Sequence, residues 1–530
     1  MKLSKYIKYG ALAMALLAGT SACDSGFQQL NQDPNNPTHA TPQLVMPYVE
    51  QQTANIVHSY DLSWYSGGIW VQQLAEIQYS DEDRYNIAAR TSVWNGTWDV
   101  FYTDIQENLK KVRAQAASAN DNNLMGIVEI LSVYNWQNAT DLWGPIPYSQ
   151  ALEGDLSKAN IQPQFDTQAN IYKDLIARLK TAVPKIDPSA AAPFTSQDLI
   201  YGGDMMKWKK FGGSLLLRLY MRLAKLDAAT AEAGIKMVLG DPTDYPIFTS
   251  DADNAEFGYT KYPYDNPFAD QGRTRNDFCI SATTVDTLEA LKDPRLRIYA
   301  TVVSDSATKA QLVKSTGYPY QGVTNASQSN SLQLNKASFP GYYFYSPSTP
   351  GFLLTYPEVM FIKAEAAVRG WISDDPATDY NDAIQASFNM FTDARIQPVM
   401  SDLTGSVVYN HQSFNSADYP SGLTDTDYQN YISQADVAFK TGASQAAQLH
   451  QIGLQKWIAL FGQGYEAWTC WRRTGYPFLK ANPGGQGISN KIPSRMIYPP
   501  REATVNGSNY NTAKSILGGD GLYQILSWAK

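Results

Sequence analysis

The sequence TYPEVMFIKAEAAVRGW occupies Thr355–Trp371, and a second segment of helical pattern follows it at Asp379–Phe391. Apolar side chains recur at helical spacing in both segments, which predicts two helices, the first of them ending at Arg369. The small residues Ala366 and Gly370 lie near the junction, where small side chains let two consecutive helices pack closely. The pattern therefore predicts a pair of packed helices in this part of the chain.

The residues around this junction follow the spacing of a tetratricopeptide unit. They are Ala366, Gly370, Tyr380, Ala383, Ile384 and Phe388. An insertion at Trp371–Thr378 separates the two predicted helices and departs from that pattern. We therefore expect a mainly α-helical fold, in which tetratricopeptide-like helix pairs form an α-α superhelix with long irregular loops on one side.

Further helices are predicted along much of the chain, because apolar residues recur there with the period of an α-helix. The predicted segments are Trp98–Ala116, Leu124–Trp136, Ile171–Val183, Met205–Leu226 and Ser444–Phe461. One face of Met205–Leu226 carries an apolar stripe, and the other face is basic. The stripe comprises Trp208, Phe211, Leu215, Leu219 and Leu223, and the basic residues are Lys207, Lys210, Arg218, Arg222 and Lys225. Such a stripe predicts packing in the core rather than a cofactor site.

The amino terminus, MKLSKYIKYGALAMALLAGTSAC, has the pattern of a bacterial export signal. Its apolar core is too short to span a bilayer, and small residues lead from it to Cys23. We predict a lipoprotein signal peptide at 1–22, a lipidated tether at 23–42 and a ligand-binding domain at 43–530. Cys23 is then the lipid attachment residue, and several acyl chains would anchor the protein stably. The alternative is ordinary cleavage after Ala22, which leaves an exported free thiol.

Charge and motif content argue against several classes of protein. The formal net charge is −8 with Lys and Arg scattered, whereas nucleic-acid binding needs a concentrated basic face. No later segment is apolar enough to span a bilayer, so we expect contact with a membrane through the lipid anchor only. No serine-hydrolase, zinc-protease or P-loop motif is present, and the four histidines lie far apart. We therefore predict no enzyme activity, no metal and no cofactor, although the two carboxylates of a glycosidase would leave no motif.

Several charged residues are flanked by large apolar ones, which predicts buried, paired charges rather than catalytic groups. They are Glu358, Glu365, Glu466, Arg472 and Arg473. Besides Cys23, the chain has only Cys279 and Cys470. Both are expected to be small buried side chains, and a disulfide between them is the alternative.

Two segments carry aromatic residues in a polar, turn-rich context, and they form the predicted ligand site. One is YSDEDRYNIAARTSVW at Tyr79–Trp94, and the other is YTKYPYDNPFADQGR at Tyr259–Arg273, inside the long irregular stretch Tyr245–Phe352. Prolines stiffen the second segment and lower the entropy lost on binding. We predict Tyr85, Trp94, Tyr262, Tyr264 and Asn266 as ligand contacts, with Arg84 and Arg273 as directional donors. The alternative is that these rings pin the loops to the helical scaffold.

Many segments of the chain, in order, resemble the SusD/RagB family of surface lipoproteins, in particular the SusD-like subgroup of Bacteroidetes. Besides the export signal, they are LNQDPNNPT, DLWGPIPYSQAL, GGDMMKWKKFGGSLLLRLYMRLA, Asp293-Pro294-Arg295, YPEVMFIKAEAAVRGW, QKWIALFGQGYEAWTCWRRTGYP and IPSRMIYPPRE. The resemblance implies a mostly helical, tetratricopeptide-like fold and a nutrient-binding protein that caps a SusC-like, TonB-dependent outer-membrane transporter. Family members capture glycans or oligopeptides through variable loops, so no ligand residue can be transferred by motif.

The predicted function is therefore a non-enzymatic lipoprotein of the outer membrane, exposed at the cell surface. It would capture an oligosaccharide or oligopeptide and deliver it to the transporter. One alternative is a surface glycosidase or peptidase, and another is a helical-repeat adaptor that binds only protein. A glycan-binding protein needs exposed aromatic residues in loops, whereas an adaptor would bury them between helix pairs. Tyr and Trp are abundant, at 34 and 12 residues, but both sugars and peptides bind to aromatic surfaces.

Overall fold

Helices dominate the structure, a computed structural model that describes residues 40–77, 80–87, 91–260, 264–272, 278–326, 334–403, 416–481 and 491–530. Within these ranges, no helix combines the length and the apolar character that crossing a membrane requires. The predicted signal peptide and Cys23 lie outside the described residues.

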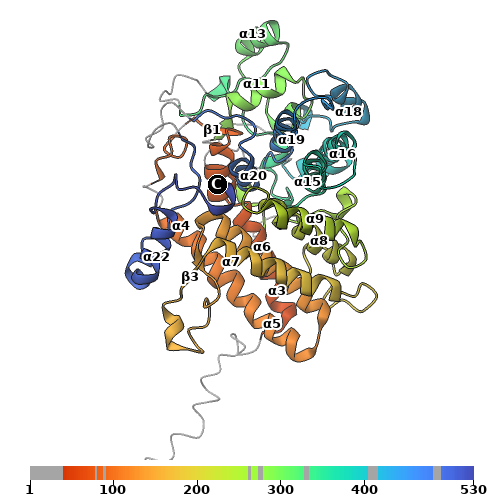
Figure 1. Cartoon of the computed structure of the whole chain (residues 1–530). Helices are drawn as coiled ribbons and strands as arrows, with labels where there is room; N and C mark the ends of the chain where they lie inside the picture. The colour runs from red at the N-terminus through yellow and green to blue at the C-terminus, as the bar shows by residue number, and fades with distance from the viewer. Residues whose placement is uncertain are drawn as a thin grey trace, which may run out of the picture.

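The amino-terminal helices form the lower part of the molecule in the view of Figure 1. They are α3 (Pro42–Val57), α4 (Thr91–Asp99), the π-helical segment η3 (Val100–Gln106), α5 (Glu107–Ala119), α6 (Asn122–Trp143) and α7 (Gln168–Ala182). Helix α6 packs against both α5 and α7. Asp121 caps it by accepting a hydrogen bond from the Leu124 backbone N–H at 2.9 Å. Gly144 ends it at a φ of 87°, where glycine is favoured, so α6 continues beyond the predicted Leu124–Trp136.

The predicted helix at Met205–Leu226 is α8 (Met205–Arg222), which packs against α6, α7 and the following α9 (Ala228–Gly240). Its apolar stripe is buried, as predicted. The basic side of α8 is not fully exposed to solvent, because Arg218 and Arg222 are buried as well. A further helix, α15 (Tyr356–Val368), packs on α8 and brings the Glu358 carboxylate to Arg218, whereas Arg222 lies beside Glu466 and Asp141.

The carboxy-terminal helices contain the predicted pair, formed by α15 and α16. In order, they are α16 (Pro376–Asn389), α17 (Asp393–Ser401), α18 (Asp425–Ile432), α19 (Gln445–Ala459), α20 (Gly464–Thr474), α21 (Glu502–Val505) and α22 (Gly507–Leu517). Ala366 and Ala383 are fully buried, in agreement with close packing of α15 on α16. Helix α19 packs on α15, and α20 packs on α19. Figure 1 shows α15, α16, α18 and α19 in the upper right, with α8 and α9 between them and α5 to α7, and α22 at the left.

The stretch Tyr245–Phe352 is less irregular than predicted. It contains β4 (Ala255–Phe257), α10 (Pro267–Gly272), β5 (Phe278–Ile280), α11 (Ala282–Ala290), α12 (Leu296–Tyr299), α13 (Ser306–Thr316) and α14 (Tyr342–Tyr345), and it ends in β6 (Gly351–Leu354). The antiparallel pairs are β4–β6, β5 with β1 (Leu74–Glu76), and β2 (Ile146–Pro147) with β3 (Phe165–Asp166). Short elements contain too few residues to show a clear repeat of apolar side chains, so the sequence pattern did not predict these elements. In Figure 1, α11 and α13 lie at the top, away from α5 and α7.

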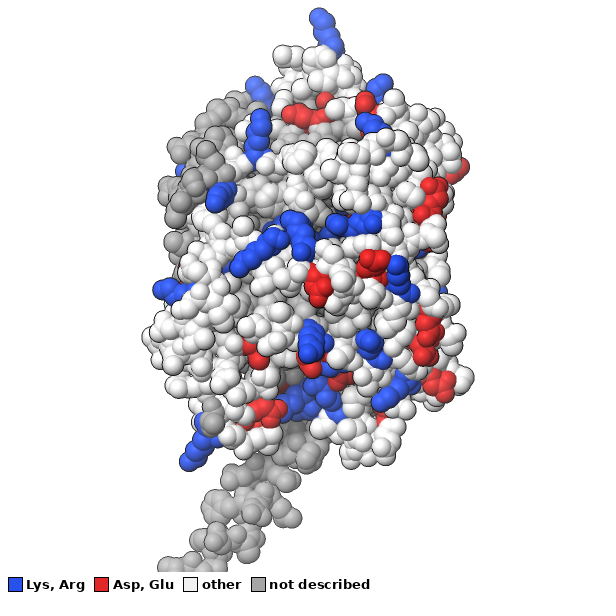
Figure 2. Space-filling view, viewed as in Figure 1, with Lys and Arg blue, Asp and Glu red and all other residues white. Residues whose placement is uncertain are grey.

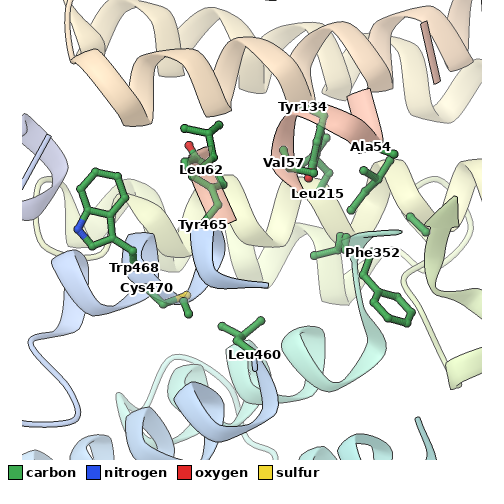
Figure 3. Close-up of a cluster of buried hydrophobic side chains, with 14 of the residues drawn as sticks. Ala54, Val57, Leu62, Tyr134, Leu215, Phe352, Leu460, Tyr465, Trp468 and Cys470 are labelled. Carbon is green, nitrogen blue, oxygen red and sulfur yellow. The ribbon is translucent and has the colours of Figure 1, made fainter. Parts of the chain in front are cut away.

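One hydrophobic core connects the helical groups. Figure 3 shows part of it, where Leu62 of η1 (Tyr60–Gly68), Tyr134 of α6, Leu215 of α8 and Tyr465 of α20 gather in one cluster. The mainly α fold of helix pairs with long loops on one side is therefore confirmed. Cys279 and Cys470 are both buried and are not joined to each other by a disulfide.

Candidate functional site

The pairing of β1 with β5 joins the strand that precedes one predicted ligand-binding segment to the strand that follows the other. In this antiparallel pair, Glu76 lies opposite Phe278. The first segment, 79–94, follows β1, and the second, 259–273, precedes β5. The two segments are far apart in the sequence, and this antiparallel pairing makes β1 end at the same edge of the strand pair where β5 begins.

A cluster of aromatic rings holds the second loop in place. We call Tyr60, Trp64, Phe268, Phe278 and Tyr345 the aromatic cluster. The rings of Trp64 and Phe268 are stacked, with centroids 3.4 Å apart and planes inclined by 9°. Phe268 also contacts Tyr345 at 5.3 Å, and Tyr60 meets Phe278 edge to face at 5.1 Å. Edge-to-face ring pairs are a favourable geometry, and the buried rings remove apolar area from water, so this cluster joins α10 to η1, β5 and α14.

Tyr264 and Asn266 lie in the second loop, in different environments. Tyr264 is open to solvent, with 58% of its surface exposed. Asn266 is buried, and its side-chain amide donates to the Thr349 carbonyl at 2.9 Å. Its Oδ1 accepts from the Phe268 backbone N–H at 2.9 Å, and its own N–H donates to the Pro347 carbonyl at 2.8 Å. Asn266 therefore holds the loop that presents Tyr264.

Tyr85 is buried in the first loop and has a φ of 60°, which non-glycine residues rarely adopt. The turn around it is organised by the Asp83 carboxylate. This group accepts from the side-chain amide of Asn325 at 2.7 Å, and from the backbone N–H groups of Ala326 at 2.8 Å and Glu76 at 3.2 Å. The first loop is thus tied both to β1 and to the segment that contains Asn325.

The Asp83 carboxyl changes charge near neutral pH. Burial raises its pKa from 3.8 to about 7, although the hydrogen bonds it accepts and the nearby Arg84 oppose that shift. Arg84 itself donates from Nε to the Ser80 carbonyl at 3.1 Å and lies 3.6 Å from the Asp81 carboxylate. These local contacts stabilise the turn, and the predicted role of Arg84 as a ligand donor stays a prediction.

The other predicted ligand residues fall outside the described part of the chain. Trp94 belongs to α4, but its side chain is not among the described ones. Tyr262 and Arg273 lie in the undescribed segments 261–263 and 273–277. Their predicted contacts with ligand therefore stay predictions.

Buried ion pairs join α8, α15 and α20. They are Arg218–Glu358 at 2.6 Å, Arg222–Glu466 at 2.9 Å and Arg473–Glu365 at 2.5 Å. Burial raises the carboxyl pKa values of Glu365 and Glu466, but the neighbouring arginines outweigh it and hold them at about 2. Arg472 donates to the Asp141 carbonyl at 2.5 Å and lies over the Trp468 ring, 3.6 Å from its centroid. The five residues predicted to carry buried charges are therefore buried, and each has a polar or charged partner.

A group of aromatic residues near the end of α20 was not predicted from the sequence. The loop after this helix places Tyr476 and Phe478 beside His450 of α19. Phe478 is 76% exposed, although it is a large apolar residue. The run GYPF at 475–478 has aromatic residues around a proline and a glycine. The same signal singled out the loop at 259–273, so it was available in the sequence.

Within the described ranges, no three His, Cys, Asp or Glu side chains are grouped so that they could hold a metal ion. His58 is buried, and its Nε2 lies 2.8 Å from the Phe352 carbonyl oxygen. Burial lowers the pKa of His58 to about 4, so the ring is neutral at pH 7. This histidine links α3 to β6 and has a structural role.

A protein family described as starch-binding and associating with the outer membrane, SusD-like_2, matches residues 34–499. The chain belongs to this family of SusD-like binding proteins. The resemblance seen in the sequence is thereby confirmed, and so is the association of the family with the outer membrane. No curated protein sequence matches the chain.

Several solved structures share the fold over almost their whole length. A SusD-like protein of Bacteroidetes AC2a is 22% identical, covers 93% of this chain and 100% of its own, and has a TM-score of 0.75. A chitin-binding SusD homolog from Flavobacterium johnsoniae is 24% identical, with 92% and 98% coverage and a TM-score of 0.72. A SusD homolog from Bacteroides fragilis is 22% identical, with 93% and 100% coverage and a TM-score of 0.72. At these identities, the similarity establishes the shared fold.

Proposed function

We propose that this protein captures an oligosaccharide at the cell surface and delivers it to a SusC-like, TonB-dependent transporter of the outer membrane. The observation that carries the proposal is Tyr264, an exposed aromatic side chain on a loop held by buried contacts, in a chain of a starch-binding family. A ring that is already positioned costs little entropy when a ligand packs on it.

The proposed binding surface is built from the two loops that adjoin β1 and β5. Tyr264, Tyr262 and Trp94 are the proposed contacts. Tyr85 and Asn266 were predicted as contacts too, but the structure buries both side chains. Their proposed contribution is to hold the conformation of the loops rather than to present a large surface to the ligand.

The proposed anchor is a lipid on Cys23, which would make the mature chain a tether at 23–42 followed by the binding domain at 43–530. The family association with the outer membrane supports this arrangement. A lipid anchor would keep the protein at the membrane without a transmembrane helix. The transporter would then lie within reach of the same membrane surface.

Sugar is favoured over peptide as the ligand because the family is described as starch-binding, and because two solved structures of the same fold are described as chitin-binding. Binding without catalysis is proposed for the same reason. A peptide ligand and a glycosidase activity are the outcomes that a direct experiment separates from this proposal.

The test is isothermal titration of the purified protein against maltoheptaose, chitohexaose and a panel of oligopeptides. We expect saturable binding of one saccharide class, no binding of the peptides, and intact saccharide when the mixture is analysed afterwards. Binding of peptides alone would overturn the choice of sugar. Shortened saccharide products would overturn the assignment as a binding protein without catalytic activity.

The transporter partner is tested separately, by purification from native membranes in mild detergent. A stable complex usually buries about 1,600 Å² in total, so a lid-like partner should remain bound under these conditions. We expect a large β-barrel protein to be recovered with this chain. Repeated recovery of the chain alone would argue against delivery to a dedicated transporter.

A further inference from the structure

A pocket of about 240 Å³ lies among the helices that follow the loop region. Its walls come from Lys225 in the turn after α8, and from α15, α19, α20 and the residues that directly follow α15 and α20. It includes no residue of the two loops that carry the proposed oligosaccharide site. The chain therefore has a second concave surface with its own lining.

The charged residues that line this pocket are mostly cationic. Lys225, Arg369, Lys456 and Arg473 are basic, and Glu365 is acidic. Arg473 donates from Nη1 to Glu365 Oε1 at 2.7 Å, and Arg369 donates from Nη2 to the same oxygen at 2.8 Å. One carboxylate thus serves two guanidinium groups. Lys456 lies 3.7 Å from the Glu358 carboxylate, which offsets its charge, so the excess positive charge of the pocket comes from Lys225, Arg369 and Arg473. Figure 2 shows several Lys and Arg side chains in a row across the middle of the face of the molecule in view.

Lys225 is the cation of this pocket that is most available to a ligand. It is exposed, and no described carboxylate forms an ion pair with it. Partial burial and the positive charges of Arg473 and Arg369 lower the pKa of its ammonium group. An anion placed between these three cations would relieve their mutual repulsion.

An exposed aromatic platform adjoins the pocket. Tyr476 lines the pocket, and its ring meets that of Phe478 edge to face at 5.2 Å. The Phe478 ring stacks on His450 at 4.8 Å with planes inclined by 26°. The loop is held to α20 because the Tyr476 N–H donates to Thr474 Oγ1 at 3.1 Å and Trp471 Nε1 donates to the Pro477 carbonyl at 3.2 Å. Phe478 is therefore a positioned ring with one face toward solvent.

We propose that this pocket binds an acidic saccharide, with a carboxylate or sulfate group held by Lys225 and Arg369 and a sugar ring packed on Phe478. The positive pocket selects the anionic group, and the platform offers an apolar surface that a free inorganic anion would not use. This second site goes beyond the oligosaccharide site on the loops and does not depend on it.

The test is isothermal titration of the purified full chain with trigalacturonate, which carries carboxylates, and with galactose 6-sulfate. Maltotriose and inorganic sulfate serve as the neutral and sugar-free probes. We expect at least one of the acidic saccharides to bind, and Lys225→Gln and Phe478→Ala each to weaken that binding about tenfold. The binding should also weaken as salt is raised, because Lys225 is exposed to solvent.

The matched control is Lys236→Gln, which removes an exposed lysine of α9 that is paired with Glu232 at 2.6 Å. It should leave the affinity for the acidic saccharide unchanged. An unchanged affinity in Lys225→Gln would overturn the proposal. Inorganic sulfate that binds as tightly as galactose 6-sulfate, with no effect of Phe478→Ala, would overturn the saccharide part. Failure of every neutral oligosaccharide to bind would instead count against the loop site alone.

Discussion

Tyr264 and Asn266 lie two positions apart in one loop and have different roles in the proposed binding surface. The side-chain amide of Asn266 donates to the Thr349 carbonyl and accepts from the Phe268 backbone N–H, and these two hydrogen bonds fix the loop. Tyr264 is left free to meet a ligand, because its ring projects from a loop that is already held. The buried hydrogen bonds of Asn266 thus hold in place the loop on which the exposed ring of Tyr264 lies.

Replacing Tyr264 by alanine should weaken saccharide binding by roughly 1–3 kcal/mol, as truncation of a central contact residue does. The melting temperature should stay unchanged, because the ring is mostly exposed. Titration with the saccharide identified in the panel gives the affinity, and a thermal melt gives the stability. Tyr48→Ala, at an exposed tyrosine of α3, is the control and should bind normally. Normal binding by Tyr264→Ala would place the site elsewhere.

Because the pKa of the Asp83 carboxyl is raised in the folded protein, we expect the free energy of unfolding to depend on pH. Its pKa is about 7 in the folded protein and 3.8 without the fold, so the folded state holds the proton more tightly. The contribution of this group is therefore fully present below pH 3.8 and is lost as the pH rises toward 7, by about 1.4 kcal/mol for each pH unit. The stability advantage of the wild type over Asp83→Asn should shrink between pH 5 and pH 8.

Urea unfolding of both proteins at each pH measures this difference. Comparison with the variant at the same pH cancels the contributions of other groups, such as His58, that titrate in both proteins. An advantage that stays constant from pH 5 to pH 8 would show that Asp83 is ionised throughout this range. An advantage that grows with pH would contradict the sign of the effect.

At the scale of elements, η1 and α20 touch through their backbones. A Cβ atom added to Gly464 would lie 2.0 Å from the Ser63 carbonyl oxygen, and one added to Gly67 would lie 2.2 Å from the carbonyl carbon of Gly464. No side chain fits between two segments this close. The contact places α20, which carries Glu466 and Arg473, next to the segment that carries Trp64.

Gly464→Ala should therefore destabilise the protein by about 1–3 kcal/mol or more, because the added methyl group forces η1 and α20 apart. Gly240→Ala, at the last residue of α9 with no atom within 4 Å of the new Cβ, is the matched control and should be neutral or slightly stabilising. Chemical unfolding measures both changes. Equal stabilities of the two variants would mean that the contact between η1 and α20 relaxes at no cost.

In the whole molecule, the helix pairs form a scaffold that supports two different surfaces, one on loops and one in a pocket between helices. The loops around β1 and β5 present Tyr264, and the pocket among α15, α19 and α20 gathers cations. Buried ion pairs such as Arg218–Glu358 lie between helices of this scaffold. Replacing one partner of such a pair would leave an uncompensated buried charge, which is strongly destabilising.

The proposed lipid anchor on Cys23 would attach the whole molecule to the membrane. Cys23→Ala should release the exported protein into the soluble fraction while its fold and its affinity for ligand stay unchanged, because Cys23 precedes the folded domain. Fractionation of cells that lack the transporter measures the release, and this background removes retention through the partner. Ser25→Ala, a change two residues further, is the control and should remain in the membrane. Equal retention of Cys23→Ala would contradict lipid attachment at this residue.

Local sequence patterns were enough to predict the helical scaffold, the α15–α16 pair and five of the buried charges, although not the burial of Arg218 and Arg222. These follow from local patterns, since the period of apolar residues and the neighbours of a charge can be read within one segment. The family could be recognised in the same way, because its segments occur in order along the chain. The proposed ligand loops were located by their aromatic and proline content, although two of their residues, Tyr85 and Asn266, are buried.

Which residues are partners, and which are exposed, depends on how distant parts of the chain pack together. Arg218 and Glu358 are 140 positions apart in the sequence, and the packing of α15 on α8 brings them together. The pairing of β1 with β5 and the stacking of Trp64 on Phe268 likewise join distant segments. A local pattern carries no information about such contacts, because the same side chain is solvated or buried according to what packs against it.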